Sequence, residues 1–132
     1  MAIQFMRHLL IPTAFFLLIG NLATSQSLEG RWKGTSICQI KNSPCHDEKV
    51  IYHISKKSED NSYQIIANKI VEGKEDNMGT LIFSYDEKQS MLYLIDKDQD
   101  VKWQFKVTGN EMHGTLTSRG KLFRVVDLKK ED

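Results

Sequence analysis

The chain has 132 residues, of which 18 are Lys or Arg, 17 are Asp or Glu and 40% are hydrophobic. An apolar leader holds one of the basic residues and none of the acidic ones, so the remaining chain carries 17 of each sign. This near neutrality gives no support to binding of nucleic acid or of an anionic membrane surface, both of which require a basic face. The length after the leader suits one small domain with one core.

The first 25 residues have the organisation of a secretory signal peptide. Arg7 and His8 form a short basic start, an apolar run follows at Leu9–Ile19, and Ala23-Thr24-Ser25 places small residues before Gln26. The apolar run of about 11 residues is too short for the roughly 20 that a membrane-spanning helix needs. We therefore predict cleavage after Ser25, no membrane anchor, and a mature chain of residues 26–132 that is secreted or periplasmic.

Both cysteines of the sequence, Cys38 and Cys45, lie in the mature part. Two cysteines in an exported chain favour a disulfide, which here would close a short turn between the first two strands. The alternative is a metal or redox site formed with the adjacent His46. The spacing matches neither a C-x-x-C motif nor a zinc pattern with a second ligand pair, so we predict the disulfide and no metal site.

After residue 26 the pattern is one of β-rich or alternating runs separated by polar or glycine-containing breaks, with little helical periodicity. The clearest alternation is Val101–Val107, where Val101, Trp103, Phe105 and Val107 share a face. Eight strands are predicted, at Gly30–Ile40, Val50–Lys56, Tyr63–Val71, Gly79–Tyr85, Met91–Ile95, Val101–Val107, Glu111–Ser118 and Lys121–Leu128.

Short turns between eight strands indicate an all-β, antiparallel meander. A twisted meander of this length removes its exposed edges by closing. We therefore expect an eight-stranded up-and-down barrel in which the last strand pairs with the first. An open two-layer sandwich is the alternative, and only the pairing of those two strands separates the two.

Gly30-Arg31-Trp32 is a G-x-W motif at the start of the first strand, and with the following meander it resembles the lipocalin and wider calycin superfamily. The stretches at 78–86 and 111–128 are similar to small exported bacterial lipocalin-like proteins of unassigned function. The resemblance implies a single lipocalin-like barrel domain over residues 26–132. It also implies that Trp32 lies at the closed end, with an Arg of the last strand packed across its ring. Arg124 fits that structural role by position, with Arg119 as the alternative, and a guanidinium over an indole is a favourable cation–π contact.

An eight-stranded barrel either fills its interior with its own side chains or holds one small ligand. The inward aromatic residues are the candidate ligand-binding residues of the lumen, namely Tyr52, Tyr63, Phe83, Trp103 and Phe105.

No motif indicates catalysis or a cofactor. Asp96–Asp100 begins like a calcium loop, but Val101 and Val107 stand where the Gly and the Glu of that loop are required, so a solvated turn is predicted. His46, His53 and His113 are scattered without ligand spacing, and there is no nucleophile elbow or phosphate loop.

Three functions follow from these observations. The first is an exported protein that binds a small apolar or amphipathic molecule in the barrel. The second is a protein-interaction module with a packed core and no ligand, whose partner the sequence does not specify. The third is a small barrel enzyme, which would need two or more ionisable side chains converging in the lumen. We expect the first, with no catalytic residues.

Overall fold

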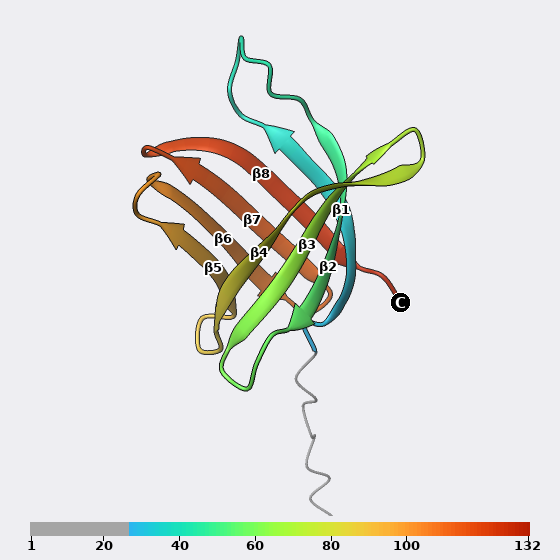
Figure 1. Ribbon diagram of the computed structural model, residues 1–132, viewed down its shortest axis with the longest axis vertical. Helices are drawn as coiled ribbons and strands as arrows, with labels where there is room; N and C mark the ends of the chain where they lie inside the picture. The colour runs from blue at the N-terminus through green and yellow to red at the C-terminus, as the bar shows by residue number, and fades with distance from the viewer. Residues whose placement is uncertain (1–26) are drawn as a thin grey trace, which may run out of the picture.

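The computed structural model describes residues 27–132, which form eight β-strands and no helix (Figure 1). The predicted leader, residues 1–25, and its cleavage site after Ser25 lie outside the described residues. The strands are β1 (Gly30–Cys38), β2 (Glu48–Lys56), β3 (Ser62–Val71), β4 (Lys74–Asp86), β5 (Met91–Asp96), β6 (Val101–Thr108), β7 (Glu111–Ser118) and β8 (Lys121–Lys130).

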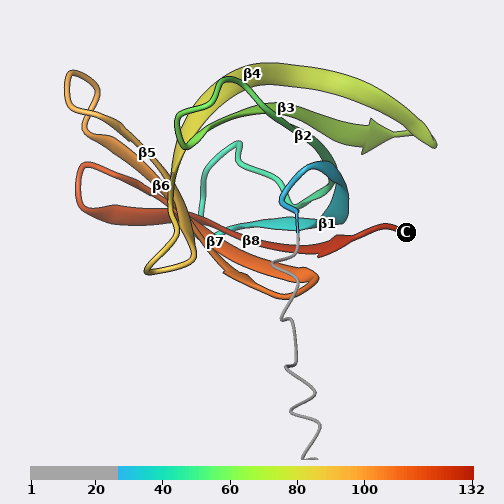
Figure 2. The ribbon, with the colours of Figure 1, turned by 90° about the horizontal axis from the view of Figure 1, so that it is seen from below.

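The eight strands close into an up-and-down barrel. Each strand pairs antiparallel with the next, and β8 pairs with β1 from Trp32–Lys130 to Cys38–Arg124 (Figures 1 and 2). The predicted barrel is therefore confirmed, and the open sandwich is excluded because the first and last strands are hydrogen-bonded to each other. Within residues 27–132 there is no helix with the length and apolarity needed to cross a lipid bilayer.

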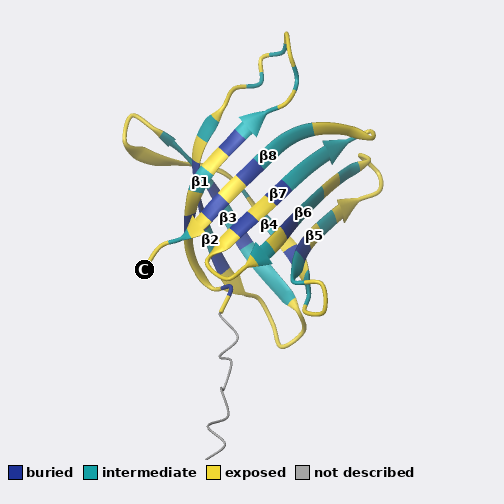
Figure 3. Ribbon diagram, turned by 180° about the vertical axis from the view of Figure 1, so that it is seen from behind, coloured by how far each residue is buried: buried dark blue, intermediate teal, exposed yellow. Residues whose placement is uncertain are grey.

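Along the strands, buried residues recur between more exposed ones (Figure 3), as expected when successive side chains alternate between the two faces of a strand. In β2, for example, Val50, Tyr52 and Ile54 share a face and are all buried, although Ile51 on the other face is buried as well. Each of the eight strands contributes one of the largest fully buried side chains, and they are Trp32, Val50, Ile65, Phe83, Leu92, Phe105, Met112 and Val126.

The seam between β1 and β8 depends on Gly34. A Cβ atom at this position would collide with the backbone carbonyl of Asp127 in β8. Because the obstacle is backbone rather than a flexible side chain, only glycine allows the two strands to approach this closely.

Strand β4 begins earlier than expected. The predicted fourth strand starts at Gly79, but β3 and β4 stay paired as far as Val71–Lys74, and only Glu72 and Gly73 form the turn. Both of these residues have positive φ, 51° and 77°. The register of β3 against β4 shifts between Ala67 and Asn68, and Ala67 pairs with Gly79 (φ 145°). The two strands pair again beyond this irregularity, so the hairpin is longer than predicted. The hairpin projects beyond the barrel wall (Figures 1 and 2).

The barrel wall is weakest between β4 and β5. These strands pair at three positions only, where Ser84–Asp86 meets Met91–Tyr93. Beyond Tyr93, β5 continues to pair with β6 but not with β4. The two strands diverge toward the end of the barrel that carries the β1–β2 connection (Figure 1).

Trp32 closes the other end of the barrel. Its side chain is 1% exposed, and its Nε1 donates a hydrogen bond to the carbonyl of Leu28 at 2.9 Å. The prediction that Arg124 packs across the Trp32 ring is wrong. Lys130 takes this position, with its Nζ 6.0 Å from the ring centroid. The strand register explains the difference, since Trp32 pairs with Lys130, whereas Arg124 pairs with Cys38 at the opposite end of β1. Arg119 lies in the β7–β8 turn.

The predicted disulfide between Cys38 and Cys45 is present, with the two Cα atoms 5.9 Å apart. It closes the connection between β1 and β2. The same connection is held by the Cys38 amide, which donates to Asp47 Oδ1 at 2.9 Å.

Candidate functional site

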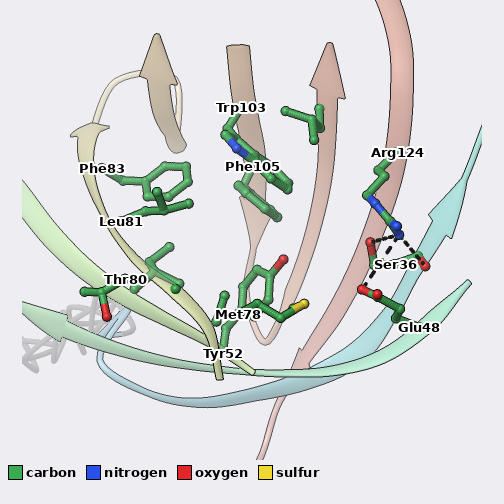
Figure 4. A pocket seen from close by; sticks show the side chains of 14 residues that line it. Ser36, Glu48, Tyr52, Met78, Thr80, Leu81, Phe83, Trp103, Phe105 and Arg124 are labelled. Atoms are coloured by element: carbon green, nitrogen blue, oxygen red, sulfur yellow. Dashed lines mark hydrogen bonds and ion pairs between the residues drawn. The ribbon is translucent and has the colours of Figure 1, made fainter. Parts of the chain in front are cut away.

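The barrel contains a cavity of about 310 Å³ at the end away from Trp32 (Figure 4). It is lined by 14 side chains from β1, β2, β3, β4, β6, β7 and β8. Met78 is one of them and is 42% exposed, so it lies where the cavity opens to solvent. The volume is at the lower end of the range of ligand pockets in proteins.

An aromatic cluster centred on Phe105 forms part of the cavity wall. The Phe105 ring stacks on Trp103 with centroids 5.8 Å apart, and it meets Phe83 at 5.8 Å and Tyr52 at 6.1 Å edge to face. Offset stacks and edge-to-face pairs are the favourable geometries for aromatic rings. Because Phe105 is fully buried and contacts three rings, the wall is a rigid, preformed surface.

Gly114 makes room for this cluster. A Cβ atom at this position of β7 would collide with the Phe105 ring. Gly114 and Phe105 are direct partners in the β6–β7 pairing, so the ring lies across the neighbouring strand. The absence of a side chain at Gly114 therefore sets the position of the aromatic wall.

The wall formed by β3 and β4 is apolar. Ile65 and Ala67 contribute from β3, and Leu81 and Phe83 contribute from β4. Figure 4 shows Leu81 and Phe83 across the cavity from Arg124. A bound molecule would therefore gain from burying apolar surface on this side.

A polar group faces this apolar wall. Arg124 Nη1 donates to Ser36 Oγ at 3.1 Å and to the His46 carbonyl at 3.0 Å, and it lies 3.9 Å from a carboxylate oxygen of Glu48 (Figure 4). The Arg124 and Glu48 side chains are only 16% and 23% exposed. The only full charges among the cavity-lining side chains that the structure describes are thus one positive and one negative charge, side by side.

The Tyr52 hydroxyl points into the cavity (Figure 4). Burial raises the pKa of Tyr52 to about 12, with a smaller lowering effect from the Arg124 charge and a smaller raising effect from Glu48. The hydroxyl is therefore protonated at neutral pH and can donate a hydrogen bond. None of the residues 27–132 accepts a hydrogen bond from it, and since no polar side-chain atom among them is both fully buried and without a partner, the hydroxyl oxygen is open to the cavity.

The structure brings together four of the five predicted lumen residues. Tyr52, Phe83, Trp103 and Phe105 line the cavity. Tyr63 does not; it packs edge to face against Tyr85 with centroids 6.0 Å apart. Tyr63 has the right inward-facing parity, but it lies at the filled end of the barrel.

Sequence reasoning missed the polar members of the site. No motif singles out Ser36 or Glu48, and the resemblance placed Arg124 across the ring of Trp32 rather than at the cavity. The available signal was alternation: Trp32, Gly34 and Ser36 share a parity, so Ser36 faces inward if Trp32 does. Glu48 shares the parity of Val50 and Tyr52 in the same way.

The histidines do not converge. His53 Nε2 lies 2.7 Å from Glu75 Oε1 on the outer surface, and this hydrogen bond is the main cause of a lowered Glu75 pKa. His113 Nδ1 lies 2.6 Å from Asp127 Oδ1, also outside the lumen. Among the described residues no group of three or more His, Cys, Asp or Glu could hold a metal ion.

The predicted turn is present at residues 97–100, directly after Asp96 at the end of β5. Asp96 Oδ1 accepts hydrogen bonds from the amides of Asp98 and Gln99, both at 3.1 Å. The carboxylate therefore holds the backbone of the turn, which is a common use of Asp at this position.

No protein-family model matches the chain, and no curated protein matches it by sequence. A redesigned β-barrel superposes with a TM-score of 0.58 and 12% identity over 80% of this chain and 92% of the other. The siderocalin Ex-FABP, which functions through dual ligand specificities, gives a TM-score of 0.52 and 9% identity over 79% of this chain and 73% of the other. At these identities the similarity shows the fold alone, which is a lipocalin-like barrel.

Proposed function

We propose that this protein is an exported carrier or receptor that binds one small apolar or amphipathic molecule in the barrel cavity. The observation that carries the proposal is a preformed cavity of about 310 Å³ with apolar and aromatic walls and a few polar groups gathered on one side. Ligand sites usually combine these features. The siderocalin among the similar structures also has ligand specificities, which agrees with this use of the fold.

Two observations favour export. One is the signal-peptide pattern that ends at Ser25. The other is the Cys38–Cys45 disulfide, because disulfides persist chiefly in oxidising compartments. The proposed location is therefore extracellular or periplasmic.

We propose binding rather than catalysis because the ionisable groups at the cavity are poorly suited to chemistry. Tyr52 holds its proton at neutral pH, since its pKa is raised to about 12. Arg124 is tied to Ser36 and to a backbone carbonyl. An enzyme would need an activated nucleophile or a general base beside the substrate.

A second candidate is a protein-interaction module. Three large hydrophobic side chains are exposed on β4 and β5, where these strands diverge: Ile82 is 43% exposed, Tyr93 37% and Ile95 51%. Exposed apolar patches often mark contact surfaces. This candidate predicts that the cavity plays no part in function.

The binding proposal is tested by titration with the neutral fluorescent dye N-phenyl-naphthylamine. The Ala67→Phe variant places a ring in the cavity, and Ile66→Phe places the same ring on the opposite face of β3. We expect Ala67→Phe to weaken dye binding about tenfold or more, because the apolar wall is no longer available to the dye. Ile66→Phe should bind as the unaltered protein does.

Failure of the unaltered protein to bind the dye or any co-purifying small molecule, as judged by native mass spectrometry, would overturn the proposal. Equal binding by both variants would place the dye outside the cavity and would also count against it. Either result would favour the interaction-module candidate.

A further inference from the structure

The polar side of the cavity has a definite charge balance. Arg124 and Glu48 are adjacent, with 3.9 Å between Nη1 and Oε2. Arg124 Nη1 also donates to Ser36 Oγ and to the His46 carbonyl, which connects β8 to β1 and to the β1–β2 connection. The Nη1 group of the guanidinium is therefore engaged in holding the barrel mouth, and the carboxylate beside it offsets the positive charge.

The Tyr52 hydroxyl lies at the cavity without a hydrogen-bond partner among the described residues. Its hydroxyl is turned into the cavity, while its ring is fixed edge to face against Phe105 at 6.1 Å (Figure 4). No polar side-chain atom of residues 27–132 is both fully buried and without a partner, so solvent in the cavity reaches this hydroxyl. A ligand that displaces this solvent would leave the hydroxyl unsatisfied, at a cost of about 1–3 kcal/mol, unless a ligand atom accepts the hydrogen bond.

We propose that the cavity selects a molecule with an apolar body and an uncharged hydrogen-bond acceptor, such as an ester or ketone carbonyl, which receives a hydrogen bond from the Tyr52 hydroxyl. This inference rests on the binding function proposed above and adds the chemical class of the ligand. The apolar body lies against the wall formed by Ala67, Leu81 and Phe83.

Charged head groups are disfavoured by the same geometry. A ligand carboxylate that approaches Arg124 also approaches Glu48, so attraction and repulsion offset each other while the cost of removing the charge from water remains. A ligand ammonium meets the same balance with the signs reversed. A neutral carbonyl has a much smaller cost of dehydration and finds a donor in Tyr52.

The test uses two isomeric probes, methyl octanoate and nonanoic acid, each measured by displacement of N-phenyl-naphthylamine at neutral pH. The probes have the same atoms, but only the acid is ionised. We expect the ester to bind about tenfold more tightly than the acid, because the acid must lose the hydration of its charge.

Two variants assign this preference to residues. Tyr52→Phe removes only the hydroxyl and should weaken ester binding about three- to tenfold, the value of one net hydrogen bond, with the affinity of the dye measured separately in each variant. Glu48→Gln removes the compensating carboxylate and should strengthen nonanoate binding about tenfold. Tyr93→Phe, on the outer face of β5, is the matched control and should behave as the unaltered protein.

The outcomes separate this inference from the proposed function. Absence of dye binding in the unaltered protein contradicts the binding function itself. Dye binding together with tighter binding of nonanoate than of the ester, or with equal ester affinity in Tyr52→Phe, leaves that function intact and overturns the selection of an uncharged acceptor. If circular dichroism shows that Tyr52→Phe is misfolded, the test uses Glu48→Gln instead. An unchanged preference of Glu48→Gln for the ester over nonanoate would equally overturn the inference.

Discussion

Single residues determine the shape and polarity of the cavity. Gly114 leaves the space that Phe105 occupies, and Phe105 in turn holds the rings of Tyr52, Phe83 and Trp103. Tyr52 combines two roles in one side chain. Its ring belongs to the core, whereas its hydroxyl faces the empty space above that core (Figure 4).

The burial of Tyr52 predicts a loss of stability at alkaline pH. Its pKa is raised from 10.0 to about 12 in the folded protein, so the folded state keeps a proton that the unfolded chain loses. The free energy of unfolding should be unaffected below about pH 10 and should fall by about 2–3 kcal/mol as pH rises toward 12. Urea unfolding measured between about pH 9 and pH 12 checks this.

The Tyr52→Phe variant is the control for that titration, because it keeps the ring and lacks the titrating group. Its stability should fall less steeply over the same pH range. The pKa of Tyr63 is also raised, mainly by burial, so the stability of both proteins keeps some dependence on pH in this range. Identical slopes in the two proteins would show that Tyr52 is not buried in the way described.

At the scale of elements, the connection between β1 and β2 bears directly on the site. It carries the Cys38–Cys45 disulfide, and the carbonyl of His46 within it accepts a hydrogen bond from Arg124 on β8. Glu48 is the first residue of β2. The disulfide therefore constrains the segment that leads into Glu48, whose carboxylate lies at the cavity.

Loss of this disulfide should lower the free energy of unfolding by about 2.5 kcal/mol, the chain-entropy value for a loop of about eight residues. The double substitution Cys38→Ser with Cys45→Ser, compared with the unaltered protein in guanidinium chloride, measures the effect. Addition of a reducing agent should destabilise the unaltered protein by a similar amount and leave the double variant unchanged. An unchanged denaturation midpoint in the variant would mean that the loop is equally constrained without the bond.

For the molecule as a whole, closure is the decisive feature. The pairing of β1 with β8 joins the two ends of the described chain and leaves the β4–β5 contact as the shortest seam, with three paired positions. The end of the barrel that contains Trp32 is filled by side chains, and the end that contains Arg124 holds the cavity. The tilt and stagger of the strands determine which side chains reach which end.

The seam between β1 and β8 should be sensitive to a single added methyl group. Gly34→Ala places a Cβ atom against the carbonyl of Asp127, so the strands must separate, and we expect a loss of about 3 kcal/mol or more. Gly73→Ala is the matched control: its φ of 77° costs about 1–2 kcal/mol, but no atom lies near its Cβ. Thermal unfolding of both variants gives the comparison, and equal losses would contradict the close approach at Gly34.

The sequence by itself determined the strands, the meander and most of the inward-facing side chains, because the alternation of side chains across a strand is a local property of the backbone. It also determined the Cys38–Cys45 pair, since the chain between the two cysteines is short. Local alternation indicates which face of the strand a residue occupies, but not how far along the barrel axis the residue lies. Tyr63, for example, faces inward but lies outside the cavity.

Only the tertiary structure decided the positions along that axis. The register of β1 against β8 brought Lys130 rather than Arg124 to Trp32, and it left Arg124 free to meet Glu48 and Ser36. The register of β3 against β4 extended their hairpin and placed Tyr63 beside Tyr85, away from the cavity. These registers follow from the stagger that closes eight tilted strands into one barrel, which is a property of all the strands together and of no single segment.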